Sequence, residues 1–281
     1  MASATASPLA PALATARDRL AAAGCRSPAA DARALARRSV ANGYSGALER
    51  FEALVDRRAA REPLAYILGR QRFRGLELRV DPRVLVPRPH TEALVEAGLT
   101  LPRGARVLDL CTGSGAVALA LARARPDLRL TGADLSPDAL DVARENGDRL
   151  GLEVSWLESD LLLGAPGPWD AVLANAPYIA ERDEPGLAPE LAAHEPSAAF
   201  RGGPDGLDTI RRLIEQARTA VPWLALEVGD GHAGAVRGLL SQAGFRRITT
   251  RRDFTGVERV VLESRELAGD SVHPVPAQEA P

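Results

Sequence analysis

The sequence predicts an α/β protein in which a small helical domain and a β-hairpin precede a doubly wound, mostly parallel sheet of seven strands. After residue 103, short apolar strands alternate with helical segments, which is typical of a parallel sheet covered on both faces. Before residue 63, apolar residues recur at helical spacing instead. The chain has 281 residues, of which 46% are hydrophobic and 26% charged, so it is long enough for one large and one small globular domain.

The N-terminal part is predicted to form short helices. Apolar residues follow the helical period over 13–23, 29–40 and 47–60. Glycine, proline and asparagine punctuate the gaps at 24–28 and 42–46, so we place the helix breaks there. These helices bury one apolar stripe each.

A β-hairpin is predicted to follow. Pro63 ends the helical pattern, and from Phe73 to Val86 apolar and polar residues alternate, with a turn expected near Asp81–Pro82. The chain is thereby divided into a helical N-terminal domain (1–71), a β-hairpin linker (72–92), the sheet domain (93–264) and a polar tail expected to be disordered (265–281).

The sheet domain is read from its alternating pattern. The predicted strands are 106–110, 128–134, 153–157, 171–175, 223–228, 245–250 and 258–263, and the predicted helices are 116–124, 137–150, 206–220 and 233–242. Ser136 is the expected N-cap of the second helix, because a serine before a helical run can accept a hydrogen bond from a free N–H of the first turn.

Composition excludes several classes of protein. No apolar run approaches the roughly 18 residues that a membrane span needs. The N-terminus has no basic region of the kind that opens a secretory signal. Cys25 and Cys111 are the only cysteines, too few for a disulfide framework or a zinc site. We expect a cytoplasmic enzyme.

Charge is unevenly distributed. Residues 1–74 hold 13 arginines against 6 acidic residues, a balance of +7, and residues 75–281 hold 22 against 31, a balance of −9. The basic segment indicates either a face that meets an anionic partner, such as RNA or a ribosome-associated protein, or a solvated arginine-rich helical surface.

A glycine-containing loop follows the first strand of the sheet. Gly113 and Gly115 lie between this strand and an alanine-rich helix, where backbone N–H groups can closely approach a ligand. Asp134 ends the second strand, 19 positions after Gly115, where a carboxylate can accept bonds from ribose hydroxyls. The spacing predicts a site for a nucleoside cofactor. The dinucleotide pattern G-x-G-x-x-G fails, because Ala118 stands at its third glycine.

The pattern D-x-C-T-G-S-G, which ends at Gly115, resembles the first motif of class I S-adenosylmethionine methyltransferases, D-x-G-x-G-x-G. Cys111 replaces the first glycine. A cysteine is small enough to pack there if its backbone angles are negative, and a reactive thiol is the alternative interpretation.

Asn175-Ala-Pro-Tyr178 follows the fourth strand and resembles the Asn-Pro-Pro-Tyr motif of methyltransferases that act on planar nitrogens. An amide nitrogen is a poor nucleophile, because its lone pair is delocalised into the carbonyl. The side-chain oxygen of Asn175 and a neighbouring carbonyl can accept both of its N–H groups, and Tyr178 can stack on the flat group. Ala176 replaces a proline, and its carbonyl is retained.

Several longer segments are similar to the bacterial release-factor glutamine methyltransferase family (HemK/PrmC). They are EPLAYILG (62–69), RFRGLELRVDPRVLVPRPHTE (72–92), NAPYI (175–179), HEPSAAFRGGPDGLDTIRRLI (194–214) and LALEVG (224–229). The resemblance implies the Rossmann-like class I methyltransferase fold and a helical substrate-recognition domain. It also implies methyl transfer from S-adenosyl-L-methionine to the N5 amide nitrogen of the Gly-Gly-Gln glutamine in a peptide chain release factor.

The same resemblance assigns site residues. The cofactor would contact Cys111, Thr112, Gly113, Ser114, Gly115, Asp134, Asp160, Leu161 and Asn175. The target amide would contact Asn175, Ala176, Pro177 and Tyr178, of which Asn175 and Tyr178 are the predicted catalytic residues. His90 stands where the family has an acid, and no metal site is expected, because His194 and His232 show no ligand spacing with it. Glu92 and Glu195 are expected to be structural partners.

Alternatives remain at this point. An exocyclic adenine amine presents the same two N–H groups as a glutamine amide, so an adenine-N6 methyltransferase acting on DNA or RNA fits the motif. The acidic balance of residues 75–281 argues against direct nucleic-acid binding. Cys111, Ala176 and His90 depart from the motifs, which leaves open a cofactor-binding paralogue with lost or shifted activity.

Overall fold

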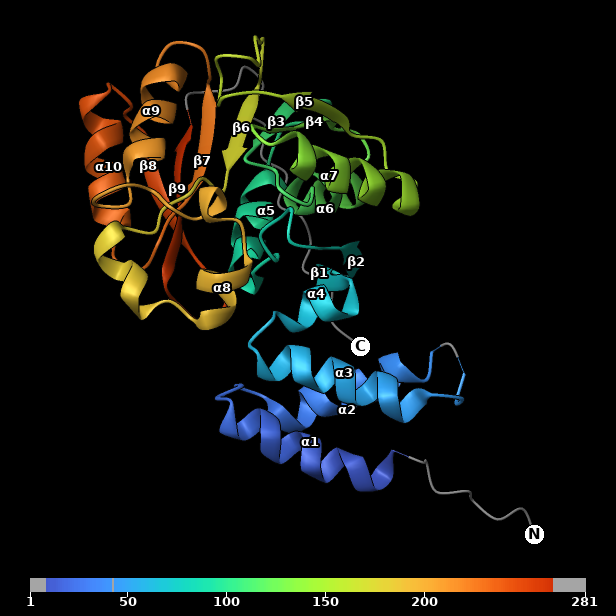
Figure 1. Ribbon diagram of the computed structural model, residues 1–281. Helices are drawn as coiled ribbons and strands as arrows, with labels where there is room; N and C mark the ends of the chain where they lie inside the picture. Colours follow the sequence, from blue (N-terminus) through green and yellow to red (C-terminus); the bar gives the residue numbers. More distant parts are fainter. Residues whose placement is uncertain (1–8, 42, 265–281) are drawn as a thin grey trace.

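The computed structural model describes residues 9–41 and 43–264. Figure 1 shows a helical unit at the bottom, a small hairpin above it and the sheet domain at the top, in the order of the chain. The predicted disordered tail, residues 265–281, lies outside the described residues. None of the helices within the described ranges is long and apolar enough to cross a membrane.

The helical unit, residues 9–62, is built from α1 (Ala10–Ala22), α2 (Pro28–Ser39) and α3 (Ala47–Ala59). The breaks between them coincide with the glycine- and proline-containing gaps predicted from the sequence. Each helix buries one apolar stripe in a shared core, as its spacing predicts. The core includes Leu20, Leu35, Phe51 and Val55, all fully buried.

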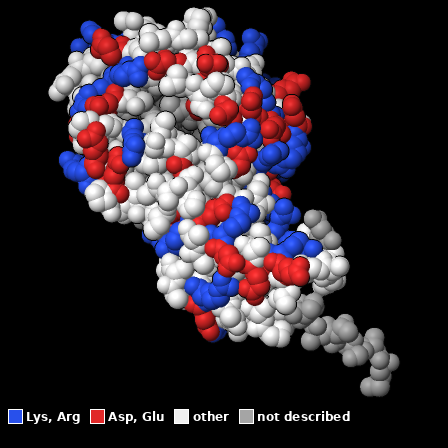
Figure 2. Space-filling model, in the orientation of Figure 1, with Lys and Arg blue, Asp and Glu red and all other residues white. Residues whose placement is uncertain are grey.

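Arginines of the helical unit alternate with acidic side chains on the face seen in Figure 2. Arg19 pairs with Glu52 and Asp56 across two helices, so part of the basic surplus is used inside the unit. Arg33 and Arg37, one turn apart on α2, are exposed and have no partner among the described residues. The unit therefore combines internal ion pairs with free surface arginines.

Pro63 does not end the helical pattern, contrary to expectation. It precedes a further short helix, α4 (Leu64–Leu68), whose first N–H bonds run back to the Pro63 carbonyl. Proline suits this place because its fixed φ matches a helix start, where its missing N–H is not needed.

The hairpin turns earlier than the sequence suggested. Strands β1 (Arg70–Phe73) and β2 (Leu76–Arg79) are joined by Arg74 and Gly75, and not near Asp81–Pro82. Both turn residues have positive φ, 44° and 74°, which is the geometry of a two-residue turn whose twist matches that of antiparallel strands. The alternating residues beyond β2 form an extended connection that crosses to the sheet domain.

All seven predicted strands form one sheet, in the order β5-β4-β3-β6-β7-β9-β8. Their bounds are β3 (Arg106–Leu110), β4 (Arg129–Asp134), β5 (Ser155–Glu158), β6 (Ala171–Ala174), β7 (Trp223–Glu227), β8 (Ile248–Arg252) and β9 (Glu258–Ser264). The first five in spatial order are parallel, and β9 runs antiparallel to both of its neighbours.

Helices cover both faces of the sheet. One face carries α5 (Glu92–Gly98), α6 (Ala116–Ala124) and α7 (Pro137–Leu150), and the other carries α9 (Asp208–Ala217) and α10 (Ala233–Gln242). Alternate strand residues supply the two cores, as the period of two in a strand requires. The remaining helical segments are η1 (Pro89–Thr91), η2 (Glu181–Gly186), α8 (Pro189–His194) and η3 (Ser197–Ala199).

Ser136 caps α7 as predicted, accepting a hydrogen bond from the Ala139 N–H at 3.2 Å. Further along this helix, Asn146 is fully buried and joins three parts of the fold. Its side chain accepts the Arg79 N–H at 2.6 Å and donates to the Arg79 and Ser114 carbonyls, both at 3.0 Å. One amide therefore holds the hairpin and the loop after β3 against α7.

We expect Asn146→Ala to lower the free energy of unfolding by about 2–4 kcal/mol, because the buried Ser114 carbonyl and the partly buried backbone groups of Arg79 lose their partners. Urea denaturation measures the change. The control is Asp148→Ala, at an exposed site on the same helix, which should cost no more than about 0.5 kcal/mol. Equal losses for the two variants would contradict the bridging role of Asn146.

Candidate active site

A cavity of about 410 Å³ lies at the carboxyl ends of β3, β4 and β6. Doubly wound sheets bind ligands at this edge, where the strand order reverses. Of the residues predicted from the sequence, the cavity wall contains Cys111, Thr112, Gly113, Ser114, Asp134, Asp160, Leu161, Asn175 and Pro177. Gly115, Ala176 and Tyr178 are not part of the wall.

The loop from β3 to α6 is fastened to the end of β4. Gly113 donates its N–H to one carboxylate oxygen of Asp134 at 2.9 Å, and Ser136 donates to the other at 3.0 Å. Gly115 begins α6 with a φ of 79°, and a Cβ there would lie 2.8 Å from the Trp156 ring. Backbone angle and packing together require glycine at this position, even though Gly115 does not line the cavity.

Cys111 does not have the negative backbone angles under which a cysteine was expected to pack at this position. Its φ is +56°, in the left-handed region that favours glycine, so it occupies a glycine conformation. Such a backbone costs of the order of 1–3 kcal/mol and persists where the surroundings enforce it. Burial, together with the charges of Asp134 and Asp109, raises the pKa of the Cys111 thiol. The thiol is therefore protonated at neutral pH, which argues against the reactive-thiol alternative.

Asp109 is a cavity residue to which the sequence reasoning assigned no role, although it opens the motif D-x-C-T-G-S-G. It is only 1% exposed and accepts hydrogen bonds from the Thr112 hydroxyl at 2.6 Å and the Ala118 N–H at 3.2 Å. Burial raises the pKa of Asp109 to about 7. The Asp109 side chain therefore both lines the cavity and stabilises residues 111–115 between β3 and α6, which we call the β3–α6 loop.

Asp160 and Leu161 lie side by side in the wall after β5. Leu161 is buried and has a positive φ of 54°, and the Ser159 hydroxyl donates to its carbonyl at 2.6 Å. Asp160 forms an ion pair of 2.5 Å with Arg212 of α9. The turn thus presents an apolar side chain and a carboxylate to the same cavity.

Asn175 lines the same cavity as residues of the β3–α6 loop. Leu110 of β3 pairs with Ala174 of β6, so the loop and Asn175 leave neighbouring strands at the same level. The Asn175 side-chain nitrogen donates to the Thr91 hydroxyl at 3.3 Å. This bond leaves the side-chain oxygen as an acceptor, and no residue within 9–41 or 43–264 donates to it.

Tyr178 is turned toward a neighbouring polar cluster. Its hydroxyl donates to Glu227 at 3.4 Å and lies 3.3 Å from the Nε2 of His90, which is itself 3.2 Å from Glu227. Glu227 ends β7 and is fully buried. The hydroxyl is thereby anchored outside the cavity wall, and the stacking role assigned to Tyr178 stays a prediction.

The predicted structural partners are found in polar contacts. Glu195 is buried, accepts the Val86 N–H at 2.9 Å and pairs with Arg88 at 2.5 Å, while Glu92 lies 4.0 Å from Arg74. Within the described ranges, no three His, Cys, Asp or Glu side chains gather in the geometry of a metal site.

One wall of the cavity comes from the linker, and sequence reasoning did not place it there. The linker residues in the wall are Arg83, Val84, Leu85, Pro87, Arg88 and Thr91. These residues belong to the segment RVLVPRPHTE (83–92), whose first part was expected to form a strand of the hairpin. The contact became visible only in three dimensions, because the linker and the strand ends are distant in the chain.

Comparisons with known sequences agree with this geometry. The sequence family "Methyltransferase small domain" matches residues 89–204, and "PrmC N-terminal domain" matches residues 45–69. A release factor glutamine methyltransferase of Mycolicibacterium smegmatis is 40% identical over 268 residues, which cover 88% of this chain and 94% of that protein. This chain belongs to the release factor glutamine methyltransferase family. A relative of the same name from Geobacter sulfurreducens is 43% identical over 214 residues, 74% of this chain and 75% of its own.

Solved structures support the fold. The hMettl16 catalytic domain matches with a TM-score of 0.56 at 18% identity, covering 76% of this chain and 83% of its own. A methyltransferase from Pyrococcus furiosus matches with a TM-score of 0.53 at 17% identity, covering 69% of this chain and 90% of its own. The predicted class I methyltransferase fold is confirmed.

We expect Thr91→Val to lower kcat for methyl transfer by about tenfold, because it removes the acceptor that orients the Asn175 amide. Thr91→Ser keeps the hydroxyl and is expected to stay within about threefold of the unmodified enzyme. Initial rates at saturating cofactor distinguish the two variants. A serine variant as slow as the valine variant would show that shape, and not the hydrogen bond, matters at this position.

Proposed function

We propose that this chain transfers a methyl group from S-adenosylmethionine to the side-chain amide nitrogen (N5) of a protein glutamine, the Gly-Gly-Gln glutamine of a peptide chain release factor. The observation that carries the proposal is Asn175, whose amide oxygen is a free acceptor at the wall of a nucleoside-sized cavity. Membership of the release factor glutamine methyltransferase family supports both the reaction and the substrate.

The cavity residues fit S-adenosylmethionine. Asp134 offers carboxylate oxygens to ribose hydroxyls, and Leu161 with Asp160 would flank the adenine. The turn at Gly113 and Ser114 would hold the methionine part of the cofactor through its backbone. The wall carries both acidic and basic side chains, Asp134 and Asp160 beside Arg83, Arg88 and Arg212, which suits a ligand with both charges such as the sulfonium and carboxylate of this cofactor. The bound cofactor would supply a methyl group on a positively charged sulfur, which is electrophilic.

The protein's contribution is to orient the glutamine amide. The Asn175 side-chain oxygen accepts one amide N–H, and a backbone carbonyl of the Ala176–Pro177 segment can accept the other. When both N–H groups are held in the amide plane, the nitrogen lone pair, which is perpendicular to that plane, can face the β3–α6 loop. The same acceptors stabilise positive charge as it develops on the nitrogen. Methylation leaves that nitrogen with one proton too many, and water can remove it.

The same acceptors would also hold an exocyclic adenine amine, so the motif alone leaves two substrates. The family relationship favours the glutamine. A release factor as substrate implies the cytoplasm as the place of reaction. No described residue of the helical unit lines the cavity, which leaves the unit free to contact a protein substrate.

Transfer of labelled methyl from S-adenosylmethionine to a purified release factor tests the proposal. We expect label on the unmodified factor and none on its variant with Gly-Gly-Gln changed to Gly-Gly-Ala. Label on both would place the modification on another atom, and label on neither would refute the proposed substrate.

Two variants separate the roles of the opposing walls. Asn175→Ala is expected to lower kcat by at least about 100-fold with cofactor affinity nearly unchanged, because only the acceptor for the substrate is lost. Asp134→Ala should instead weaken cofactor binding by about tenfold to a hundredfold. Calorimetry with the cofactor, alongside the methyl-transfer assay, measures both. Loss of cofactor binding in Asn175→Ala, or full affinity in Asp134→Ala, would contradict the assignment.

A further inference from the structure

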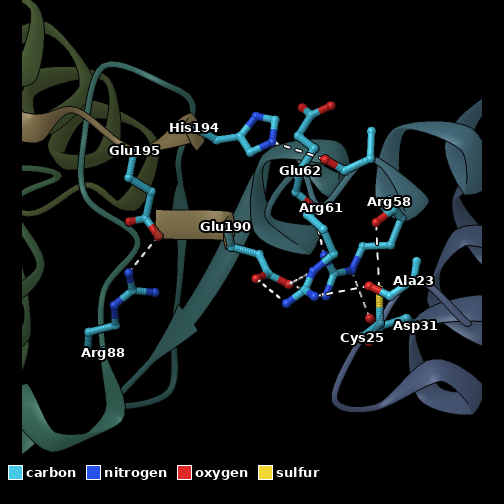
Figure 3. A network of polar contacts seen from close by, with 11 residues as sticks. Ala23, Cys25, Asp31, Arg58, Arg61, Glu62, Arg88, Glu190, His194 and Glu195 are labelled. Carbon is cyan, nitrogen blue, oxygen red and sulfur yellow. Dashed lines mark hydrogen bonds and ion pairs between the residues drawn. The ribbon is translucent and has the colours of Figure 1, made fainter. Parts of the chain in front are cut away.

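A cluster of partly buried ion pairs joins the helical unit to the segment that follows Asn175–Tyr178. Figure 3 shows Arg58 and Arg61 of the helical unit converging on Glu190 of α8. Arg61 holds both carboxylate oxygens of Glu190, with Nε 2.9 Å from one and Nη2 2.6 Å from the other. Arg58 adds a bond of 2.9 Å to the same carboxylate. We name these three side chains the Glu190 clamp.

The Glu190 clamp pairs positive charges of the helical unit with a negative charge of α8. Arg58 is 7% exposed and also pairs with Asp31 at 2.9 Å inside the helical unit. Arg61 donates to the neutral Ala23 carbonyl at 3.0 Å inside the unit, whereas its carboxylate partner among the described residues is Glu190. Removing one partner of a buried pair leaves an uncompensated charge and is costly. The helical unit therefore carries a surface built to receive this carboxylate.

The geometry of the clamp fixes direction as well as distance. A guanidinium that bonds both oxygens of one carboxylate lies nearly in its plane, so the two groups cannot turn freely against each other. Burial opposes the ionisation of Glu190, but hydrogen bonds from Arg61 and Arg58 outweigh it and lower its pKa to about 2. The pairs are thus fully charged at neutral pH. Arg61 also holds a left-handed backbone with a φ of 66°, a strained conformation for an arginine.

The residues that follow α8 reach the cavity. Glu195, directly after α8, binds the linker through Val86 and Arg88. Pro196, Ala198 and Ala199 then line the cavity. This segment begins at the Asn175–Tyr178 motif and returns to the cavity wall after touching the helical unit. Within the described residues, the hydrogen bonds and ion pairs between 9–62 and 93–264 all end on α8.

We propose that Glu190 is a positioning residue that sets the orientation of the helical unit relative to Asn175, and that this orientation is needed for a folded protein substrate but not for a short peptide. The proposal rests on the proposed function. A folded substrate held by the helical unit must present its glutamine at one place and angle, so the effective concentration of the glutamine at Asn175 depends on a rigid connection. A short peptide reaches Asn175 without touching the helical unit.

The test compares kcat and KM on an intact release factor with those on a short synthetic peptide that contains Gly-Gly-Gln. Glu190→Gln keeps the shape of the side chain and removes its charge. We expect its kcat on the release factor to fall by about tenfold, with kcat/KM on the peptide and the cofactor dissociation constant within about twofold of the unmodified enzyme. A purely structural defect near the cavity would lower both substrates together.

A matched control lies in the same segment. Glu184 of η2 pairs with Arg201 at 2.9 Å and does not contact the helical unit, so Glu184→Gln should behave as the unmodified enzyme on both substrates. Arg61→Lys keeps the positive charge and loses the two-pronged contact, and we expect it to repeat the Glu190→Gln pattern more weakly. This variant provides the same test if Glu190→Gln fails to fold.

The outcomes separate the two proposals. An active enzyme whose Glu190→Gln and Arg61→Lys variants turn over the release factor normally would overturn the role of the clamp and leave the proposed function intact. Equal losses on factor and peptide would also overturn it. If the unmodified enzyme labels neither substrate, the proposed function fails, and this inference fails with it.

Discussion

Strand β6 pairs in parallel with β3, and the chemistry of this protein depends on that neighbourhood. The two strands are more than 60 residues apart in the chain, yet Leu110 lies opposite Ala174. A polar segment begins directly after each strand. The β3–α6 loop begins at Cys111 and the motif Asn175–Tyr178 begins at Asn175. Because parallel strands end at the same edge, the residues proposed to bind the cofactor and the side chain proposed to bind the amide line one cavity.

Around this edge, polar contacts from distant segments hold the site in place. Asp134 and Asp109 accept hydrogen bonds from the β3–α6 loop, and Thr91 of the linker accepts one from Asn175. Asn146 attaches the hairpin to the same loop from behind. Preorganisation of this kind costs backbone freedom during folding, and in the proposed reaction it would let the site orient a poor nucleophile without rearrangement. The positive φ of Cys111 is consistent with a loop whose shape is imposed by its surroundings.

Sequence reasoning succeeded where the determinant is local. A glycine pair after a strand, a carboxylate at the next strand end and a serine before a helix each act within a few residues, so Gly113, Asp134 and Ser136 could be placed from the chain alone. It failed where backbone geometry or distant contacts decide. The hairpin turn was misplaced because Arg74 gives no sign of a left-handed conformation, and Cys111 has a positive φ where a negative one was expected.

The sequence by itself determined the seven strands of the sheet and the helices α6, α7, α9 and α10, and it placed two motifs at strand ends, because periodicity and turn residues are local properties of the chain. Only the tertiary structure decided that the linker forms a cavity wall, that the Tyr178 hydroxyl turns toward Glu227, and that Glu190 joins the helical unit to the segment after Asn175. These contacts pair side chains tens of residues apart. Their energies depend on burial and on the angle between charged groups, and neither quantity exists until the sheet and its helices have packed.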